Sequence, residues 1–416
     1  MGSPPDNLGS PSASGVRPGP GSPKPSRIVL IFRLLRLTLF PRWPTGPRTV
    51  KRLGLLFLLT PIFLLLQGLH WIGFLLDDLF FRGYRGVEIR EPLFIVGLPR
   101  SGTTFLQRVF ARDTDRFTTL RLWELLLAPS ITERKLWMGL GALNRVVGRP
   151  FSRLGQWGEK RGLGWLDVIH EVSLDDPEED YFLLLPVFAC FLLVVPYPYH
   201  DGIWKLARFD ELPKAEREPI MAFYKAALQR HLYLAGPEKQ LLSKNPSFTP
   251  FLRSLRESFP DGKVLCCVRD PKEVVPSLLS SIRTGANLFG YEVADPRIRD
   301  RFVSMLEFFG NHALSTLENV PRHQHAFVPL KVMRRDVKGF VLGVYERFGW
   351  EADPGFQERL AEDSDRGKGY TSRHTYSLEE FGLSEEETRG RFRRLNERFG
   401  FGGQDPNPMG GEGNPE

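Results

Sequence analysis

The sequence predicts an α/β fold in which a parallel sheet is flanked by helices and preceded by a hydrophobic helical segment. Three short apolar runs, at residues 93–96, 241–243 and 264–268, predict the strands. None of them contains a charge, as is typical of parallel strands buried on both faces. Each run ends at a turn that carries glycine, lysine or arginine, and ligands bind at the carboxyl ends of such strands. A longer uncharged stretch, residues 53–76, predicts the preceding helix.

The first strand leads into a turn suited to phosphate. Gly97 ends the strand, and a helix with Phe105 and Leu106 on one side follows the turn. The amides of such a turn and the positive end of the helix favour an anion. We therefore predict an anion cradle made of Pro99, Arg100, Ser101, Gly102, Thr103 and Thr104. A P-loop NTPase carries lysine directly after the second glycine of its loop. Thr103 occupies that position, so chemistry other than ATP hydrolysis is indicated.

Cations also follow the other two strands. The second strand stops at Lys244, and the third stops at Arg269. Asp270 is predicted to cap the next helix, with Glu273 completing a capping box. Ser277 lies two turns into that helix. We expect Arg269 and Ser277 to converge on a second phosphate, so the ligand would carry phosphates at both ends.

Two residues are candidates for a general base. Glu124 lies among large apolar residues, where burial would raise the pKa of its carboxyl. The alternative is a helix-surface or arginine-paired carboxylate. His170 is the other candidate. The acids at 175–180 are explained structurally, because Asp176 and Glu179 have the spacing of a capping box. The apolar residues that follow, 181–195, are expected to line an apolar acceptor pocket.

The charge of the chain is concentrated at its beginning. The net charge is +7, but residues 1–52 contain nine basic residues against Asp6 alone. The remainder therefore carries −1, which argues against nucleic acid as a partner of the globular part. Residues 27–40 predict a basic amphipathic helix on a membrane surface. Residues 53–76 are long enough to span a bilayer, but a helix lying in the interface is an open alternative.

Composition also divides the chain into segments. We predict a disordered leader at 1–26, a membrane-associated helical segment at 27–85, a catalytic domain at 86–400 and a disordered tail at 401–416. The three cysteines suggest no disulfide framework, and no Asn-x-Ser/Thr acceptor is open to glycosylation. These observations favour a membrane-associated protein with a cytoplasmic catalytic domain.

Over residues 80–400 these motifs resemble those of sulfotransferases, and most of all a broad bacterial-type group of the family. The resemblance rests on the cradle, residues 123–125, 177–179 and 244–246, Arg269-Asp270-Pro271, and residues 374–377. It implies a P-loop-like sulfotransferase fold. The cradle residues would bind the 5′-phosphosulfate of 3′-phosphoadenosine 5′-phosphosulfate (PAPS), and Arg269 and Ser277 would bind its 3′-phosphate.

The resemblance further implies an enzyme of EC 2.8.2 type that transfers a sulfonate from PAPS, without a metal, to a hydroxyl or an amine. Glu124 corresponds in position to the base of tyrosylprotein sulfotransferases, and Arg100 and Lys244 would neutralise the transferred group. The acceptor is expected to be a small molecule, lipid, glycan or peptide, and neither its identity nor the oligomeric state follows from the sequence. Alternative functions are a P-loop kinase or NTPase, or a catalytically silent membrane-bound nucleotide-binding protein.

Overall fold

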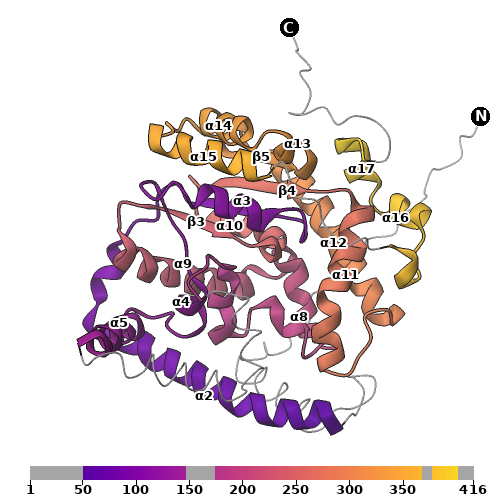
Figure 1. Ribbon diagram of the computed structural model, residues 1–416. Coiled ribbons are helices and arrows are strands. Elements are labelled where there is room, and N and C mark those ends of the chain that lie inside the picture. The colour runs from indigo at the N-terminus through magenta and orange to yellow at the C-terminus, as the bar shows by residue number, and fades with distance from the viewer. Residues whose placement is uncertain (1–49, 147–173, 368–376, 402–416) are drawn as a thin grey trace, which may run out of the picture.

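In this computed structural model, which describes residues 50–146, 174–367 and 377–401, five strands form one sheet (Figure 1). The strand order is β2-β3-β1-β4-β5, and all neighbouring strands are parallel. The strands are β1 (Leu93–Gly97), β2 (Phe117–Thr118), β3 (Gln240–Lys244), β4 (Lys263–Val268) and β5 (His325–Pro329). The predicted parallel sheet is confirmed. Because β3 and β4 flank β1, the three predicted turns meet at one edge of the sheet.

The two faces of β1 contribute to different cores. Leu93 and Ile95 pack with Leu106 on one face, while Phe94 and Val96 point into the core on the other. The first face is covered by α3 (Thr103–Phe110), α13 (Leu330–Arg335), α14 (Val337–Phe348) and α15 (Pro354–Gly367). The second is covered by α9 (Lys214–Ala235), α10 (Leu252–Ser258), α11 (Pro271–Leu288) and α12 (Pro296–Leu317).

Shorter helices and 3-10 turns connect these elements. Helices α4 (Leu122–Leu126) and α8 (Asp201–Trp204) lie on the side of the second core (Figure 1), and α16 (Glu385–Arg391) and α17 (Arg393–Phe399) close the described chain. The 3-10 turns are η1 (Arg82–Gly86), η2 (Asp180–Val187), η3 (Phe191–Val194), η4 (Lys205–Glu211), η5 (Pro246–Phe251), η6 (Arg322–Gln324) and η7 (Glu379–Phe381).

The hydrophobic stretch forms one helix, α2 (Val50–Phe80), which continues through Pro61. It lies along the side of the molecule remote from α14 and α15 (Figure 1) and packs against α5 (Ile131–Val146) and η2. Within the described residues, positions 52–80 are long and apolar enough to cross a bilayer by length and composition. The predicted leader, His170 and residues 402–416 of the predicted tail lie outside the described residues.

Gly97 allows the closest approach between β1 and β4. Its φ is +120°, a conformation that L side chains rarely adopt. A Cβ atom placed here would lie 2.0 Å from the carbonyl oxygen of Cys267 and 2.6 Å from its nitrogen. Neither backbone atom can move without disturbing the central pair of strands.

We predict that Gly97→Ala lowers the free energy of unfolding by more than about 3 kcal/mol, because it adds both backbone strain and overpacking. Urea denaturation followed by circular dichroism measures the loss. Gly139→Ala is the control, since a Cβ there meets nothing within 4 Å. The control should be neutral or up to about 1 kcal/mol more stable. A Gly97→Ala protein as stable as the wild type would contradict the close approach.

Candidate active site

The turn between β1 and α3 is fastened to the neighbouring strand. The Leu98 amide donates to the Cys267 carbonyl at 3.0 Å. The Ser101 hydroxyl donates to the same carbonyl at 3.2 Å and also to the Leu98 carbonyl. Arg100 has φ +66° and Gly102 has φ +89°, so the turn contains two left-handed residues in three. A strained non-glycine residue of this kind often marks a functional site.

The N-terminus of α3 is available to an anion. Gly102 is the N-cap residue, and it has no side chain to bond the free amides. The first amides of a helix have no acceptor within the helix, so they favour a negatively charged ligand. Thr103 and Thr104 line a cavity at this end of the helix. The predicted cradle therefore has the geometry of an anion site.

The cavity is large and has two kinds of wall. Its volume is 790 Å³. One end is polar, lined by Arg100, Arg269 and Ser277 together with the first turn of α3. The apolar part of the lining, called here the apolar wall, includes Tyr181, Phe191, Leu192, Val194, Val195, Ile282, Phe302, Met305 and Phe309. Of the apolar segment 181–195 that was predicted to line a pocket, Tyr181 and four residues of 191–195 line this cavity.

The cations of two turns meet at the polar end. The Arg100 guanidinium donates to the Ser277 hydroxyl at 3.1 Å, and Arg269 donates to the Arg100 carbonyl at 3.0 Å. Glu273 holds the Arg269 guanidinium by contacts of 2.7 and 2.8 Å. Asp270 caps α11, as predicted, by accepting from the Lys272 amide. Glu273 was expected to complete that capping box, but its carboxylate is placed on Arg269 instead.

Lys244 is brought to a pair of carboxylates beside the cavity. Its side chain is 2% exposed, and its ammonium lies 3.0 Å from Glu179 Oε1 and 3.5 Å from Glu178 Oε1. Glu179 also lines the cavity, between the cradle and the apolar wall. Burial raises the pKa of the Glu179 carboxyl, and Lys244 opposes that rise. The result is a half-buried carboxylate at the edge of an anion site.

The predicted capping box at 176–179 is wrong. Residues before η2 are not helical, and Glu179 at the N-cap of η2 makes no side-chain capping bond. The prediction failed because capping is a local pattern, whereas the partner of Glu179 is a lysine 65 residues away. One signal was available in the sequence: a lysine buried at the end of a strand needs a carboxylate partner.

Glu124 is not among the residues that line the cavity. Its carboxylate accepts from the Arg121 amide at 2.8 Å, which caps α4, and it pairs with buried Arg134 at 3.2 Å. The Arg134 guanidinium also donates to His231, whose ring reaches the Thr118 hydroxyl. The structure thus realises the arginine-paired alternative for Glu124 and does not bring it to Arg100 or Lys244.

Asp180 adds a second unusual carboxyl next to Glu179. It is 1% exposed, and the Tyr224 hydroxyl donates to it at 2.5 Å. Burial is the main cause that raises the pKa of Asp180 to about 6. Asp180 therefore orients η2, the segment that presents Glu179, against α9. Among the described residues, no group of three or more His, Cys, Asp or Glu side chains is arranged to hold a metal ion.

An anion cradle at the end of a parallel strand, with a carboxylate and an apolar wall in the same cavity, is the arrangement of a group-transfer enzyme. A family model described as "Sulfotransferase family" matches residues 92–354, more than half of the chain. The chain therefore belongs to the sulfotransferase family. Among curated proteins no significant match was found.

Solved structures show the same fold. Sulfotransferase STF9 from Mycobacterium avium superimposes with a TM-score of 0.69 at 18% identity, covering 90% of each chain. Sulfotransferase STF1 from Mycobacterium tuberculosis H37Rv superimposes with a TM-score of 0.59 at 19% identity, covering 77% of this chain and 80% of that one. At these identities the similarity establishes the fold, and the predicted sulfotransferase fold is confirmed.

The raised pKa of Asp180 predicts a pH-dependent stability. A carboxyl whose pKa is higher in the folded state stabilises the fold while protonated, and this contribution is lost as the pH rises through about 6. Asp180→Asn stays neutral and keeps an acceptor for Tyr224. Relative to wild type, the variant should therefore gain up to about 3 kcal/mol in unfolding free energy between pH 4 and 7.

Urea denaturation at several pH values measures this difference. Asp115→Asn, at an exposed position, is the control and should follow the wild type. A constant difference between Asp180→Asn and wild type across the pH range would contradict the raised pKa.

Proposed function

We propose that this protein transfers a sulfonate group from PAPS to the hydroxyl of an apolar acceptor. One observation carries the proposal: a single cavity joins an uncapped helix N-terminus with arginine side chains, a half-buried carboxylate and an apolar wall. Family membership supports sulfonate transfer over the kinase or NTPase alternative. The donor, the acceptor class and the residue roles are inferences from the geometry.

The polar end of the cavity fits the two phosphates of the donor. The amides of the cradle, with Thr103 and Thr104, would hold the 5′-phosphosulfate at the positive end of α3. Arg269 and Ser277 would hold the 3′-phosphate. Their contacts with Arg100 support this proposal, because they bring both residues next to the cradle. PAPS supplies the activated sulfonate.

The chemistry then requires a proton acceptor at the far side of the sulfonate. The acceptor oxygen forms a bond to sulfur as the bond between sulfur and the 5′-phosphate oxygen breaks. Glu179 would take the hydroxyl proton, which passes to solvent after transfer. Arg100 and Lys244 would neutralise the negative charge that builds on the transferred group and the departing oxygen. Burial raises the pKa of Glu179 and so makes its carboxylate a stronger base than an exposed one.

The apolar wall limits the class of acceptor. Aromatic and aliphatic side chains line the cavity together with the arginines, so part of this wall would contact the adenine and the rest would contact the acceptor. A hydroxyl on an apolar skeleton fits this wall better than a glycan. The first experiment is incubation of the full-length chain with labelled PAPS and separate lipid, glycan, peptide and small-molecule fractions. Labelling of an apolar fraction is expected. No labelling of any fraction, despite donor binding, would favour the silent nucleotide-binding alternative.

For the donor, we predict metal-independent binding of 3′-phosphoadenosine 5′-phosphate. Calorimetry in the presence of a chelator measures it. Arg269→Ala should weaken binding by about 1.5–3 kcal/mol, since a charged hydrogen bond is lost. Arg393→Ala, an exposed arginine on α17, should bind normally. Equal affinity for adenosine 5′-phosphate, which lacks the 3′-phosphate, would exclude this donor.

For the base, Glu179→Gln should lower turnover by about 10²–10⁴-fold while leaving donor affinity nearly unchanged. Wild-type turnover should fall as the pH drops through the raised pKa of Glu179, because protonation removes the base. Glu124→Gln is the matched comparison. We expect it to lower thermal stability through Arg134 and to change turnover little. The reverse pattern, with Glu179→Gln active and Glu124→Gln inactive, would restore Glu124 as the base.

A further inference from the structure

Helix α2 exposes apolar side chains and buries polar ones, which is the reverse of what water favours at a protein surface. Its exposed side carries eleven large apolar residues, among them Phe57 (70% exposed), Leu65 (68%) and Leu75 (68%). Its buried side carries the polar residues Gln67 and His70, and Asp77. A helix on the surface of a soluble protein normally shows the opposite arrangement.

Helix α5 extends this surface. It packs beside α2 and exposes a second set of large apolar residues. We call the combined surface the α2/α5 face. It consists of Phe57, Leu58, Leu59, Ile62, Leu65, Leu69, Trp71, Ile72, Leu75, Leu79 and Phe80 of α2 with Leu136, Trp137, Met138, Leu140 and Leu143 of α5. Contiguous apolar patches of this kind mark protein or membrane contacts.

From this arrangement we propose that the α2/α5 face docks on the surface of a lipid bilayer, with α2 lying in the plane of the interface instead of spanning the membrane. The face would contact one lipid leaflet. Only the exposed side of α2 would take part in this contact, together with the exposed residues of α5. This inference is independent of the reaction proposed above.

The hydrogen bonds of the exposed tryptophans favour lipid over a second protein as the partner of the α2/α5 face. The indole N–H of Trp71 donates inward to the Pro186 carbonyl at 3.1 Å, and that of Trp137 donates to the Leu127 carbonyl at 3.3 Å. Both exposed rings therefore present only apolar atoms. Protein interfaces normally carry about one hydrogen bond per 100–200 Å². A face whose polar groups are satisfied inward is what hydrocarbon requires.

Charge complementarity points to the same occupant. Residues 1–49, which precede α2, include seven basic residues against one acid. Beyond the other end of α2, Arg82 and Arg85 are exposed, and Lys135 lies with its ammonium 5.3 Å from the Phe81 ring. Cations at both ends of an apolar helix would meet anionic headgroups.

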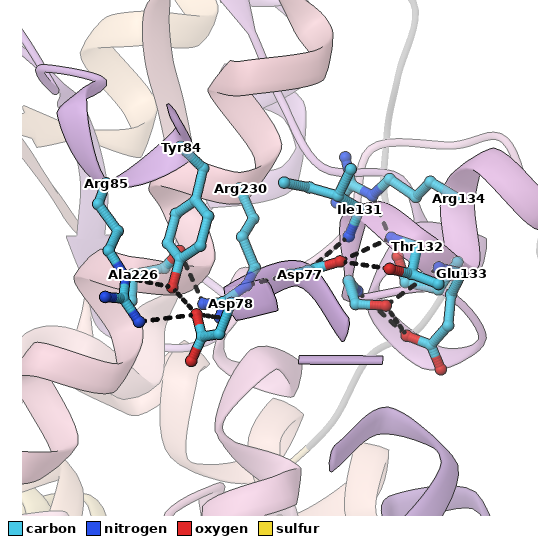
Figure 2. Close-up of polar contacts among 12 residues, drawn as sticks. Asp77, Asp78, Tyr84, Arg85, Ile131, Thr132, Glu133, Arg134, Ala226 and Arg230 are labelled. Carbon is cyan, nitrogen blue, oxygen red and sulfur yellow. Dashed lines mark hydrogen bonds and ion pairs between the residues drawn. The ribbon is translucent and has the colours of Figure 1, made fainter. Parts of the chain in front are cut away.

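The buried side of α2 explains why it would lie flat. Asp77 accepts hydrogen bonds from the Ile131 and Thr132 amides, which caps α5, and from Arg230 of α9 at 3.0 Å (Figure 2). Two turns earlier, the His70 ring lies 2.6 Å from Glu133. A spanning helix would have to leave these partners, and it would take the polar His70 ring into hydrocarbon without Glu133, which is costly.

The N-terminal half of α2 is anchored as well. Arg52 donates to the Pro196 carbonyl at 3.3 Å, and the Phe63 and Phe188 rings pack edge to face. The contacts thus continue along the helix from Arg52 to Asp77. Docking through its outer side leaves all of them intact.

The first test is flotation of the full-length chain with vesicles of phosphatidylcholine, with and without phosphatidylserine. We expect co-flotation that is stronger with the anionic lipid. Leu65→Gln/Ile72→Gln changes only exposed side chains and should lower the partition coefficient by about tenfold or more. Leu174→Gln/Tyr233→Gln, two exposed apolar residues on other elements, should float like wild type. Equal flotation of both double variants would overturn the proposal.

Light scattering in the absence of vesicles tests the competing occupant. We expect wild type and Leu65→Gln/Ile72→Gln to have the same molecular mass at matched low concentration. A wild-type dimer that becomes a monomer in the variant would show that a second copy covers the face, and would overturn docking on lipid.

The second test separates lying from spanning. Leu58, Leu65, Ile72 and Leu79 are seven residues apart, so they share one side of α2, and all are more than half exposed. Nitroxide labels at Leu58→Cys, Leu65→Cys, Ile72→Cys and Leu79→Cys should report similar shallow depths in the bilayer. The native cysteines are buried and should not react. Label depths that run from one side of the bilayer through its centre to the other along this series would show a spanning helix and overturn the proposal.

Discussion

The site depends on the contact between the β1–α3 turn and strand β4. Gly97 lets the two backbones approach, and the Cys267 carbonyl accepts from both the Leu98 amide and the Ser101 hydroxyl. These bonds aim the free amides of α3 into the cavity. They also hold Arg100 in a left-handed conformation, from which its carbonyl reaches Arg269. Without this contact the cradle and the end of β4 would be separate features.

The part of the site around Lys244 and Glu179 depends on burial. Lys244 is almost inaccessible, so it needs a carboxylate close by, and Glu179 meets that need at 3.0 Å. The same burial raises the pKa of Glu179, and the neighbouring Asp180 fixes η2 through Tyr224. A buried cation thus places a carboxylate where an acceptor would lose its proton.

The α2/α5 face and the cavity share an apolar character. Four residues of the 191–195 segment contribute to the cavity wall, and the neighbouring Phe188 and Pro196 contact α2. If both proposals hold, the acceptor would be a hydroxyl compound that dissolves in lipid. The enzyme would then work beside the leaflet that stores its substrate.

The sequence alone determined the parallel sheet, the cradle at 99–104, the cations Lys244 and Arg269, and the apolar helix within 50–80. These features depend on local patterns: uncharged runs, turn residues and a helix start. Tertiary structure decided which carboxylate belongs to the site. Glu179 and Glu124 both match local capping patterns, and only the long-range partners distinguish them. Glu179 meets Lys244 beside the cavity, whereas Glu124 pairs with Arg134. The side of α2 that faces outward was likewise set by packing, because His70 and Asp77 on its buried side have partners far away in the chain.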